Sequence, residues 1–408
     1  MDVRTARWLA SPAAVAALTT AGEALVGRDD LAAAAWLRAQ APELTAEESA
    51  AVLEQATLRR RAADRYGLDA VHGELLLSRD GLEQATRPPV AARRAEAFAA
   101  DGARRVVDLT AGLGFDVRAF LAAGLDVVAV ERDPVTAALL AANAPSATVV
   151  IGDAADVLPT LLEELGPTDV VFADPARRSP DGPRERTTGR ARPERDPARW
   201  SPPWPVIEAI AHPRVAAKVA PAFEPPPGWQ GQWTSWDRTV VEAQVTSWAL
   251  APASRRAVVL GAQSEAVVDA DGAPLPVLDA SAPVGPVLFE PDPAVVRAGA
   301  VGVLAERLDL FGVDPRSTWL TGAALTGEAA PSPALRGFRV VAELTGSPRD
   351  RRRQLGALGV DRLVVKSRDV RVDPAQVRRE LGVAEGGEHV LVLTRRAGRT
   401  AAYLTHPA

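Results

Sequence analysis

The chain has 408 residues, 47% of them hydrophobic and 24% charged, which is typical of globular proteins and long enough for two or three domains. It contains no cysteine, which excludes disulfides, thiolate zinc sites and cysteine nucleophiles. The net charge is −5, but residues 336–408 carry 15 Lys and Arg against 8 Asp and Glu, so residues 1–335 carry −12. A basic segment on an acidic body predicts contact with a polyanion, for which nucleic acid is the default candidate.

The four histidines, at positions 72, 212, 389 and 406, lack metal-ligand spacing, so we expect no metal site. No run of 18 apolar residues occurs, so no transmembrane helix and no membrane contact are predicted. Arg4 and Arg7 precede an alanine-rich stretch that faintly resembles a signal peptide, but Glu23 soon interrupts it. We therefore expect a cytoplasmic protein, and the sequence leaves its oligomeric state open.

Residues 1–100 are predicted to be helical. Residues 31–40 and 46–66 have helical periodicity, and Thr45 and Glu48 form a capping box that begins the second of these helices. A further helix begins after the pair Pro88-Pro89.

The stretch RVVDLTAGLGFD, residues 105–116, predicts a strand, a glycine turn and the start of a helix. The turn contains Gly112 and Gly114, which allow the backbone to approach a ligand closely. A dinucleotide-binding loop would need a third glycine where Val117 stands. The acidic Asp108 at the strand end suits a cationic ligand such as S-adenosylmethionine better than a pyrophosphate. From this loop alone both kinds of nucleotide remain open.

Three further predicted strands end in carboxylates at near-equal spacing. Glu131 follows Asp108 by 23 residues, Asp153 follows by another 22, and Asp174 by another 21. The carboxyl ends of parallel strands meet at one edge of a sheet, so these side chains should line one crevice. Glu131 is placed to accept hydrogen bonds from both ribose hydroxyls of a nucleoside, and Asp153 from an adenine amino group.

These motifs resemble those of class I S-adenosylmethionine-dependent methyltransferases. DLTAGLGFD with VERDPVTAALL is similar to the small-subunit ribosomal RNA guanine-N2 methyltransferases. FADPARR and the C-terminal pattern are more similar to bacterial methyltransferases that carry a THUMP-like C-terminal domain. The sequence departs from the wider pattern at Thr110, where many members have glycine, and at Ala176-Arg177, which replaces the Pro-aromatic pair of amino-methylating enzymes.

The resemblance implies an α/β protein with a Rossmann-like methyltransferase sheet. The expected domains are a helical region (1–100), a donor-binding domain (101–260), a connector (261–335) and a THUMP-like, RNA-binding domain (336–408). Gln84 and Thr86 would lie near the methionine end of the cofactor. The expected cofactor-binding residues are Asp108, Thr110, Gly112, Gly114, Asp116, Glu131 and Asp153, and the expected catalytic residues are Asp174, Pro175 and Arg177.

Residues 177–205 are rich in Pro, Gly and Arg and are predicted to form a long loop at the mouth of the crevice. Trp200, Trp204 or Phe172 would supply a surface on which a base stacks, although the two tryptophans would equally serve to anchor the loop. Lys218 and Glu242 are candidate pocket residues by resemblance only. They would equally suit a salt bridge with each other or ordinary surface charge.

The last third of the chain predicts a helix over residues 291–310, capped by Asp292, and then a β-α-β-α-β-β module from residue 336. The basic side chains of this module are the candidate phosphate contacts, namely Arg349, Arg351, Arg352, Arg353, Lys366, Arg368, Arg378 and Arg379.

We therefore expect methyl transfer from S-adenosylmethionine to a nitrogen of a base in ribosomal or transfer RNA. The absence of cysteine argues against methylation at pyrimidine C5, which needs a covalent thiolate adduct. Two rival interpretations remain open. One is a methyltransferase acting on a protein or small molecule, and the other is a non-catalytic RNA-binding protein that retains the donor fold.

Overall fold

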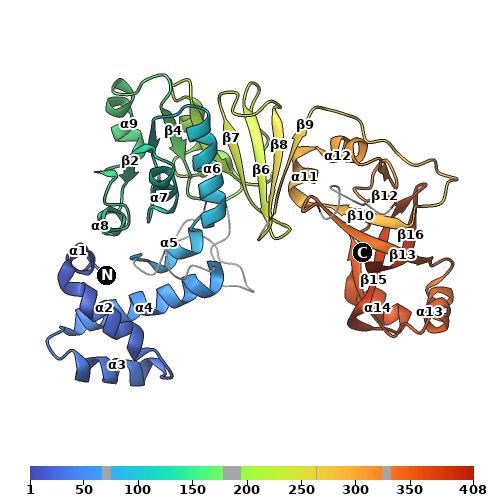
Figure 1. Ribbon diagram of the computed structural model, residues 1–408, viewed down its shortest axis with the longest axis horizontal. Coiled ribbons are helices and arrows are strands. Elements are labelled where there is room, and N and C mark those ends of the chain that lie inside the picture. The colour runs from blue at the N-terminus through green and yellow to red at the C-terminus, as the bar shows by residue number, and fades with distance from the viewer. Residues whose placement is uncertain (67–74, 178–193, 263, 324–331) are drawn as a thin grey trace. The chain divides into compact units, whose positions relative to one another are not determined.

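The computed structural model describes residues 1–66, 75–177, 194–262, 264–323 and 332–408 (Figure 1). It divides into two compact units, and each is described by itself. Unit 1 comprises Met1–Val219 with Thr246–Leu250, and unit 2 comprises Ala220–Val245 with Ala251–Ala408. No helix among the described residues is long and apolar enough to cross a membrane.

Unit 1 begins with a helical region and continues as alternating strands and helices. Its elements are α1 (Val3–Leu9), α2 (Pro12–Ala24), α3 (Asp30–Gln40), α4 (Ala46–Tyr66), α5 (Arg79–Gln84), α6 (Pro88–Ala100), β1 (Arg105–Asp108), α7 (Phe115–Ala122), β2 (Asp126–Glu131), α8 (Pro134–Asn143), β3 (Thr148–Ile151), α9 (Ala154–Glu163), β4 (Val170–Ala173), the 3-10 helix η1 (Pro197–Arg199), α10 (Trp204–Glu208) and β5 (Val215–Val219).

The predicted helical start of the chain is confirmed, and so is its capping box. The backbone N–H of Thr45 donates to Glu48 Oε2 at 2.9 Å, and that of Glu48 donates to Thr45 Oγ1 at 3.2 Å. Both orphan donors at the start of α4 are thereby satisfied. Figure 1 shows α1 to α4 gathered into one bundle.

Two buried amides attach this bundle to the sheet-bearing part of unit 1 through residues 75–77. Gln55 on α4 exchanges hydrogen bonds with the backbone of Leu77, at 2.7 and 2.8 Å. Asn143 on α8 does the same with Leu76, at 2.8 and 2.9 Å, and also donates to the carbonyl of Leu113. These side chains satisfy backbone groups that have no water within reach, so the segment is fixed from both sides.

The strands of unit 1 lie in the order β3-β2-β1-β4-β5, and each neighbouring pair is parallel. Every residue of β4 and β5 is buried, as expected for strands covered on both faces. In this order the strand ends at Asp108, Glu131, Ile151 and Ala173 lie along one edge. The predicted common edge for the four acidic strand tips is therefore confirmed.

An aromatic cluster fills the core between α6, α7 and the sheet. Phe98 stacks on Phe120 with ring centroids 5.8 Å apart, and Phe172 meets Phe120 edge to face at 5.4 Å. Trp248, from the short returning segment 246–250, lies 5.7 Å from Phe98 and donates its indole N–H to Asp101. Phe172 is completely buried, so its predicted role as a surface for base stacking is wrong.

Unit 2 is built mostly from strands. Its elements are β6 (Gln230–Trp236), β7 (Thr239–Thr246), β8 (Arg255–Leu260), β9 (Glu265–Ala270), β10 (Val287–Pro291), α11 (Pro293–Ala298), α12 (Val301–Arg307), β11 (Phe311–Gly312), β12 (Leu320–Gly322), β13 (Leu335–Glu343), α13 (Pro348–Ala357), β14 (Arg362–Ser367), α14 (Pro374–Leu381), β15 (Ala384–Arg396) and β16 (Arg399–Pro407).

The single helix predicted over residues 291–310 is wrong. The chain forms α11 and α12 instead, because Gly299 adopts φ 74° and ends α11 with a left-handed cap. The start of the helix is as predicted, since Asp292 Oδ1 accepts the backbone N–H of Ala294 at 2.8 Å.

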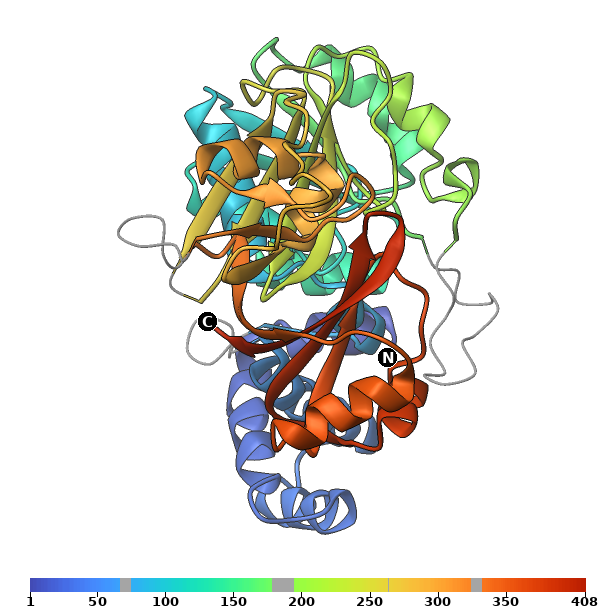
Figure 2. The same cartoon turned by 90° about the vertical axis from the view of Figure 1, so that its right-hand side faces the viewer.

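The predicted β-α-β-α-β-β order of the C-terminal module is confirmed by β13, α13, β14, α14, β15 and β16. Its strands continue a second sheet in the order β11-β12-β10-β13-β16-β15-β14. Figure 2 shows α13 and α14 side by side along one face of this sheet. A core that includes Leu355, Leu363, Leu381 and Leu404 joins the helices to the strands.

Replacing the buried amide of α8 should weaken the join between the helical bundle and the rest of unit 1. Asn143→Ala removes three hydrogen bonds and leaves buried backbone groups of Leu76 and Leu113 unpaired, so we expect the free energy of unfolding to fall by about 2 to 4 kcal/mol. Urea denaturation followed by circular dichroism measures this change. Substitution of the exposed Thr19 by Ala is the control, and an equal effect of both substitutions would contradict the role given to Asn143.

Candidate active site

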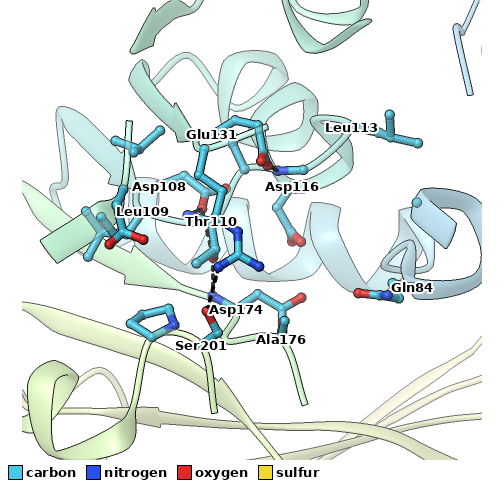
Figure 3. Close-up of a pocket in the computed structure, with 18 of the residues that line it drawn as sticks. Gln84, Asp108, Leu109, Thr110, Leu113, Asp116, Glu131, Asp174, Ala176 and Ser201 are labelled. Atoms are coloured by element: carbon cyan, nitrogen blue, oxygen red, sulfur yellow. Dashed lines mark hydrogen bonds between the residues drawn. The ribbon is translucent and has the colours of Figure 1, made fainter. Parts of the chain in front are cut away.

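One pocket lies at the edge of the unit 1 sheet where β1, β2, β3 and β4 end (Figure 3). Its volume is about 320 Å³, which is within the range of small-molecule sites. Of the expected cofactor-binding residues, all but Gly114 line it. The lining residues among the sequence-predicted set are Gln84, Thr86, Asp108, Thr110, Gly112, Asp116, Glu131, Asp153 and Asp174.

The two glycines of the turn after β1 have different roles. Gly112 has φ 54°, and the position that a Cβ would take is open. No side chain therefore separates its backbone from the pocket. Gly114 has φ 86° and caps α7, and a Cβ there would come within 2.6 Å of Leu140 Cδ1. Gly114 therefore allows the turn to pack on α8 rather than lining the pocket.

Glu131, at the end of β2, is held by backbone donors on both carboxylate oxygens. Oε2 accepts the N–H of Gly112 at 3.0 Å, and Oε1 accepts that of Asp133 at 2.8 Å. Each oxygen keeps a further lone pair for a ligand. The carboxylate is therefore oriented by the backbone and can still accept hydrogen bonds. Asp153 lines the same pocket and also caps α9, through a 3.0 Å bond from the N–H of Ala155.

Thr110 joins the ends of β1 and β4. Its backbone N–H donates to Asp108 Oδ1 at 3.0 Å, and its Oγ1 accepts the backbone N–H of Asp174 at 2.6 Å. A glycine at this position would lack the hydroxyl and leave the Asp174 N–H without this partner. The departure from the usual glycine is thereby explained, and Figure 3 shows Thr110 between the two acids.

Behind the pocket lies a network of buried charges. Asp116 Oδ1 pairs with the guanidinium of Arg94, and its Oδ2 accepts the Thr86 hydroxyl at 2.6 Å. The ammonium of Lys218 donates to Thr86 Oγ1 at 2.7 Å and to Asp174 Oδ2 at 2.5 Å. Thr86, Arg94, Asp116 and Lys218 are each at least 93% buried. Asp116 thus binds the two cations that fix the floor of the pocket.

The buried acids have opposite protonation behaviour. Burial, reinforced by the charges of Asp116 and Asp174, raises the pKa of Asp108 to about 8 against the hydrogen bond from Thr110. Burial opposes ionisation of Asp116 as well, but Arg94, Lys218 and Thr86 hold the pKa of Asp116 below its usual value. Near neutral pH Asp108 therefore carries a proton while Asp116 is charged.

Only one of the three expected catalytic residues lines the pocket. Asp174 lines it, whereas Pro175 and Arg177 are not among the lining residues. Between them, Ala176 exchanges backbone hydrogen bonds with Ser201 at 2.8 and 3.1 Å, and both residues line the wall. Arg132 reaches Ser201 Oγ from the β2 side at 3.1 Å.

The predicted loop over residues 177–205 falls partly outside the description, because residues 178–193 are not among the described residues. The predicted stacking role of its tryptophans is wrong. Trp200 and Trp204 are 3% and 6% exposed, and their indole N–H groups donate to Glu194 O and Glu208 Oε2. They anchor the segment to the body of unit 1, which was the other interpretation of the sequence.

Arg94 and Phe115 were missed in the sequence. Arg94 lies on the apolar face of α6 among Val90, Ala91 and Phe98, and a charge on such a face is a signal that could have found it. Phe115 lines the pocket at the start of α7, half-buried, and nothing in its spacing marks it. Lys218 carries the same signal as Arg94, because it is the one charge in a fully buried strand.

No cluster of three or more potential metal ligands occurs in the described parts of the chain. Parallel strands with acidic tips, a bare glycine turn and one pocket at their carboxyl ends define a nucleoside-binding α/β enzyme of the Rossmann-like class. This is the class of fold that the sequence predicted.

Comparison with known proteins makes the class specific. Two relatives, from two strains of Mycobacterium tuberculosis and both described as uncharacterized S-adenosylmethionine-dependent methyltransferases, are 30% identical over 367 residues, which is 87% of this chain and 95% of theirs. A Porphyromonas gingivalis structure described as a methyltransferase matches 100% of this chain and 98% of its own, with TM-score 0.71 and 22% identity. A family model described as THUMP domain-like matches residues 335–407.

The chain therefore belongs to the S-adenosylmethionine-dependent methyltransferases, and S-adenosylmethionine is its cofactor. Its fold is a class I methyltransferase α/β fold with an N-terminal helical region and a C-terminal THUMP-like domain. Glu242 belongs to unit 2, so its predicted place in the pocket stays a prediction.

The protonation of Asp108 should appear in the stability of the protein. Because its pKa is raised in the folded state, the folded protein binds more protons than the unfolded chain between about pH 4 and pH 8, and stability is lost as pH rises through this window. Asp108→Asn removes this ionisation while its amide oxygen can still accept from Thr110. We expect the Tm of the variant, relative to wild type, to increase up to about pH 8 and then level off. A difference in Tm that stays constant with pH would contradict the assignment.

Proposed function

We propose that the protein methylates an exocyclic or ring nitrogen of a base in ribosomal or transfer RNA. The observation that carries this proposal is the carboxylate of Asp174 in the pocket wall, held at the end of β4 by Thr110 and Lys218. When bound, S-adenosylmethionine supplies a methyl group activated by a positively charged sulfur. The chain's own residues need only orient the nitrogen toward that methyl group and exclude water.

The residues of the pocket fit the parts of the cofactor. Glu131 would accept hydrogen bonds from the ribose hydroxyls with the lone pairs that Gly112 and Asp133 leave open, and Asp153 would accept one from the adenine amino group. The positively charged end would lie toward Asp108, and Gln84, at the end of α5, lines the same pocket (Figure 3). Thr86 also lines it. Asp174 then accepts a hydrogen bond from the nitrogen that becomes methylated.

Loss of the charge at the end of β2 should weaken cofactor binding. Glu131→Gln keeps the shape of the side chain but replaces charge-assisted hydrogen bonds to the ribose with neutral ones, so we expect affinity for S-adenosylmethionine to fall by at least about tenfold. Isothermal titration calorimetry measures this change. The exposed Glu163→Gln controls for the loss of one charge. Equal affinity of wild type and Glu131→Gln would remove Glu131 from the binding site.

The C-terminal domain supports RNA as the acceptor, through α13. Arg349, Arg352 and Arg353 are exposed, and their spacing places them on one face of this helix. Arg349 lies in the first turn of α13, where a positive charge opposes the helix macrodipole, so its presence needs another reason. Phosphate binding supplies that reason, because the guanidinium groups of all three arginines attract the same anion.

The other predicted phosphate contacts are less available. Lys366 and Arg368 both pair with the buried carboxylate of Glu290, at 2.9 and 3.1 Å, and Arg238 joins them at 3.4 Å. Arg378 pairs with Glu385 at 2.9 Å. Of the predicted phosphate contacts, those that are exposed and not held by Glu290 or Glu385 are Arg349, Arg352 and Arg353 on α13 and Arg379 on α14. Arg353 also pairs with Asp350, at 3.1 Å.

The purified protein should transfer tritiated methyl groups from S-adenosylmethionine to RNA isolated from cells that lack it, and mass spectrometry of the nucleosides should show a methylated nitrogen. In the double variant Arg349→Ala, Arg353→Ala we expect the KM for RNA to rise. The salt dependence of RNA binding should also weaken, by about 0.7 to 0.9 in the slope of log K against log salt for each phosphate that is no longer neutralised.

The matched control is Arg4→Ala, Arg7→Ala, which removes two exposed arginines from unit 1. Both double variants should keep the cofactor affinity of wild type. Turnover on a protein or small molecule, with none on RNA, would favour the rival acceptor. Cofactor binding without transfer to any RNA would favour a non-catalytic RNA-binding protein.

A further inference from the structure

Lys218 lies at a position where its charge is buried, which is energetically unfavourable. It is the one charged residue of β5, all of whose residues are buried, and it is 6% exposed. Burying an ammonium group is unfavourable unless oxygens surround it. Three oxygens do so, from Thr86 at 2.7 Å, Asp174 at 2.5 Å and Asp116 at 3.7 Å.

Neutralising Asp116 does not explain this lysine. Arg94 already pairs with Asp116 directly, and the side chains of this pair are 1% and 9% exposed. The distance from Lys218 to Asp116 is longer than its distances to Thr86 and Asp174, and that to Asp174 is the shortest of these. Asp174 is the partner that lines the pocket, with 27% of its side chain exposed. The contact geometry of Lys218 therefore favours Asp174.

Asp174 is thereby held at two points and left open at a third. Its backbone N–H is fixed by Thr110 Oγ1, and Oδ2 is fixed by Lys218. Oδ1 accepts no hydrogen bond from the residues that the structure describes. A carboxylate paired with an ammonium group only accepts hydrogen bonds. Oδ1 can therefore bind a group that donates a hydrogen, but not one that offers only a lone pair.

We propose that Lys218 is the positioning residue for methyl transfer, because it holds one oxygen of Asp174 so that the other faces the methyl-accepting group and selects a nitrogen that carries a hydrogen. This inference rests on the proposed function and narrows it to amino or imino N–H acceptors. In the step, the nitrogen–carbon bond forms as the carbon–sulfur bond breaks, and the sulfur leaves neutral. The proton lost by the nitrogen passes to Oδ1 of Asp174 and then to water.

A binding experiment tests the placement of the ion pair without any acceptor substrate. S-adenosylmethionine carries a positive sulfur that S-adenosylhomocysteine lacks, and calorimetry gives the ratio of their affinities. Lys218→Met removes a positive charge beside the pocket, so the ratio should shift toward S-adenosylmethionine. The shift would be about tenfold if the two charges were about 10 Å apart at an effective dielectric near 20. Lys218→Arg, and the double variant Lys218→Met, Asp174→Asn, should restore the ratio of wild type. A ratio unchanged in Lys218→Met overturns the proposal.

A kinetic cycle on the RNA substrate tests the positioning itself. We expect Lys218→Met to lower kcat by about 100-fold, the effect of a misplaced reacting group, with the KM for S-adenosylmethionine within about threefold. Lys218→Arg should recover most of kcat, and in an Asp174→Asn background Lys218→Met should have little further effect. Fully additive effects would overturn the proposal.

The control is Lys366→Met, the same substitution at the other lysine of the chain, which pairs with Glu290 in unit 2. It should leave both the affinity ratio and kcat unchanged. If Lys218→Met lowers Tm and both affinities together, with the ratio and kcat as in wild type, Lys218 is merely a structural residue. If wild type transfers no methyl group to RNA, the proposed substrate fails, and the affinity ratio alone decides on Lys218.

Discussion

The active-site end of unit 1 depends on the buried charges around Asp116. This carboxylate on α7 binds Arg94 of α6 and Thr86, and Lys218 of β5 joins the same cluster. Such groups are stable out of water only when every partner is in place, so the cluster fixes three elements relative to one another. The end of β4 is fixed through the same lysine. The position of Asp174 in the pocket wall is therefore set in part by buried side chains behind the pocket.

Much of this site could be predicted from the sequence, because its main signals are local. Each of β1, β2, β3 and β4 ends at an acid or within two residues of one, and a parallel sheet brings such ends together. The glycine turn could also be predicted from the sequence. Only Gly112 lines the pocket, however, whereas Gly114 allows close packing on Leu140. A spacing rule predicts which residues lie at a turn, but the neighbouring helix decides which of them faces the ligand.

The parts that could not be predicted involve partners far apart in the chain. Asp116 meets Thr86 across 30 residues, and Lys218 meets Asp174 across 44. No local pattern encodes these pairings. The sequence therefore suggested Asp116 only as a cofactor ligand, and it left Lys218 open between a pocket residue, a salt bridge with Glu242 and a surface charge. The stacking role predicted for the tryptophans was wrong for a related reason. An aromatic residue in a Pro-rich segment suits base stacking and core anchoring alike, and only burial distinguishes the two, as it does for Trp200 and Trp204.

Charge counting has a similar limit in the C-terminal domain. The net charge of residues 336–408 correctly marks the domain as basic, yet Lys366 and Arg368 are held by Glu290, which lies outside that range. Lys366 and Arg368 stabilise a buried carboxylate and contribute little to a phosphate surface. Arg349 of α13 is different, because it is exposed in the first turn of the helix, where positive charge is least favourable. A locally unfavourable charge that folding does not require is better evidence for an anionic partner than the total charge of the domain.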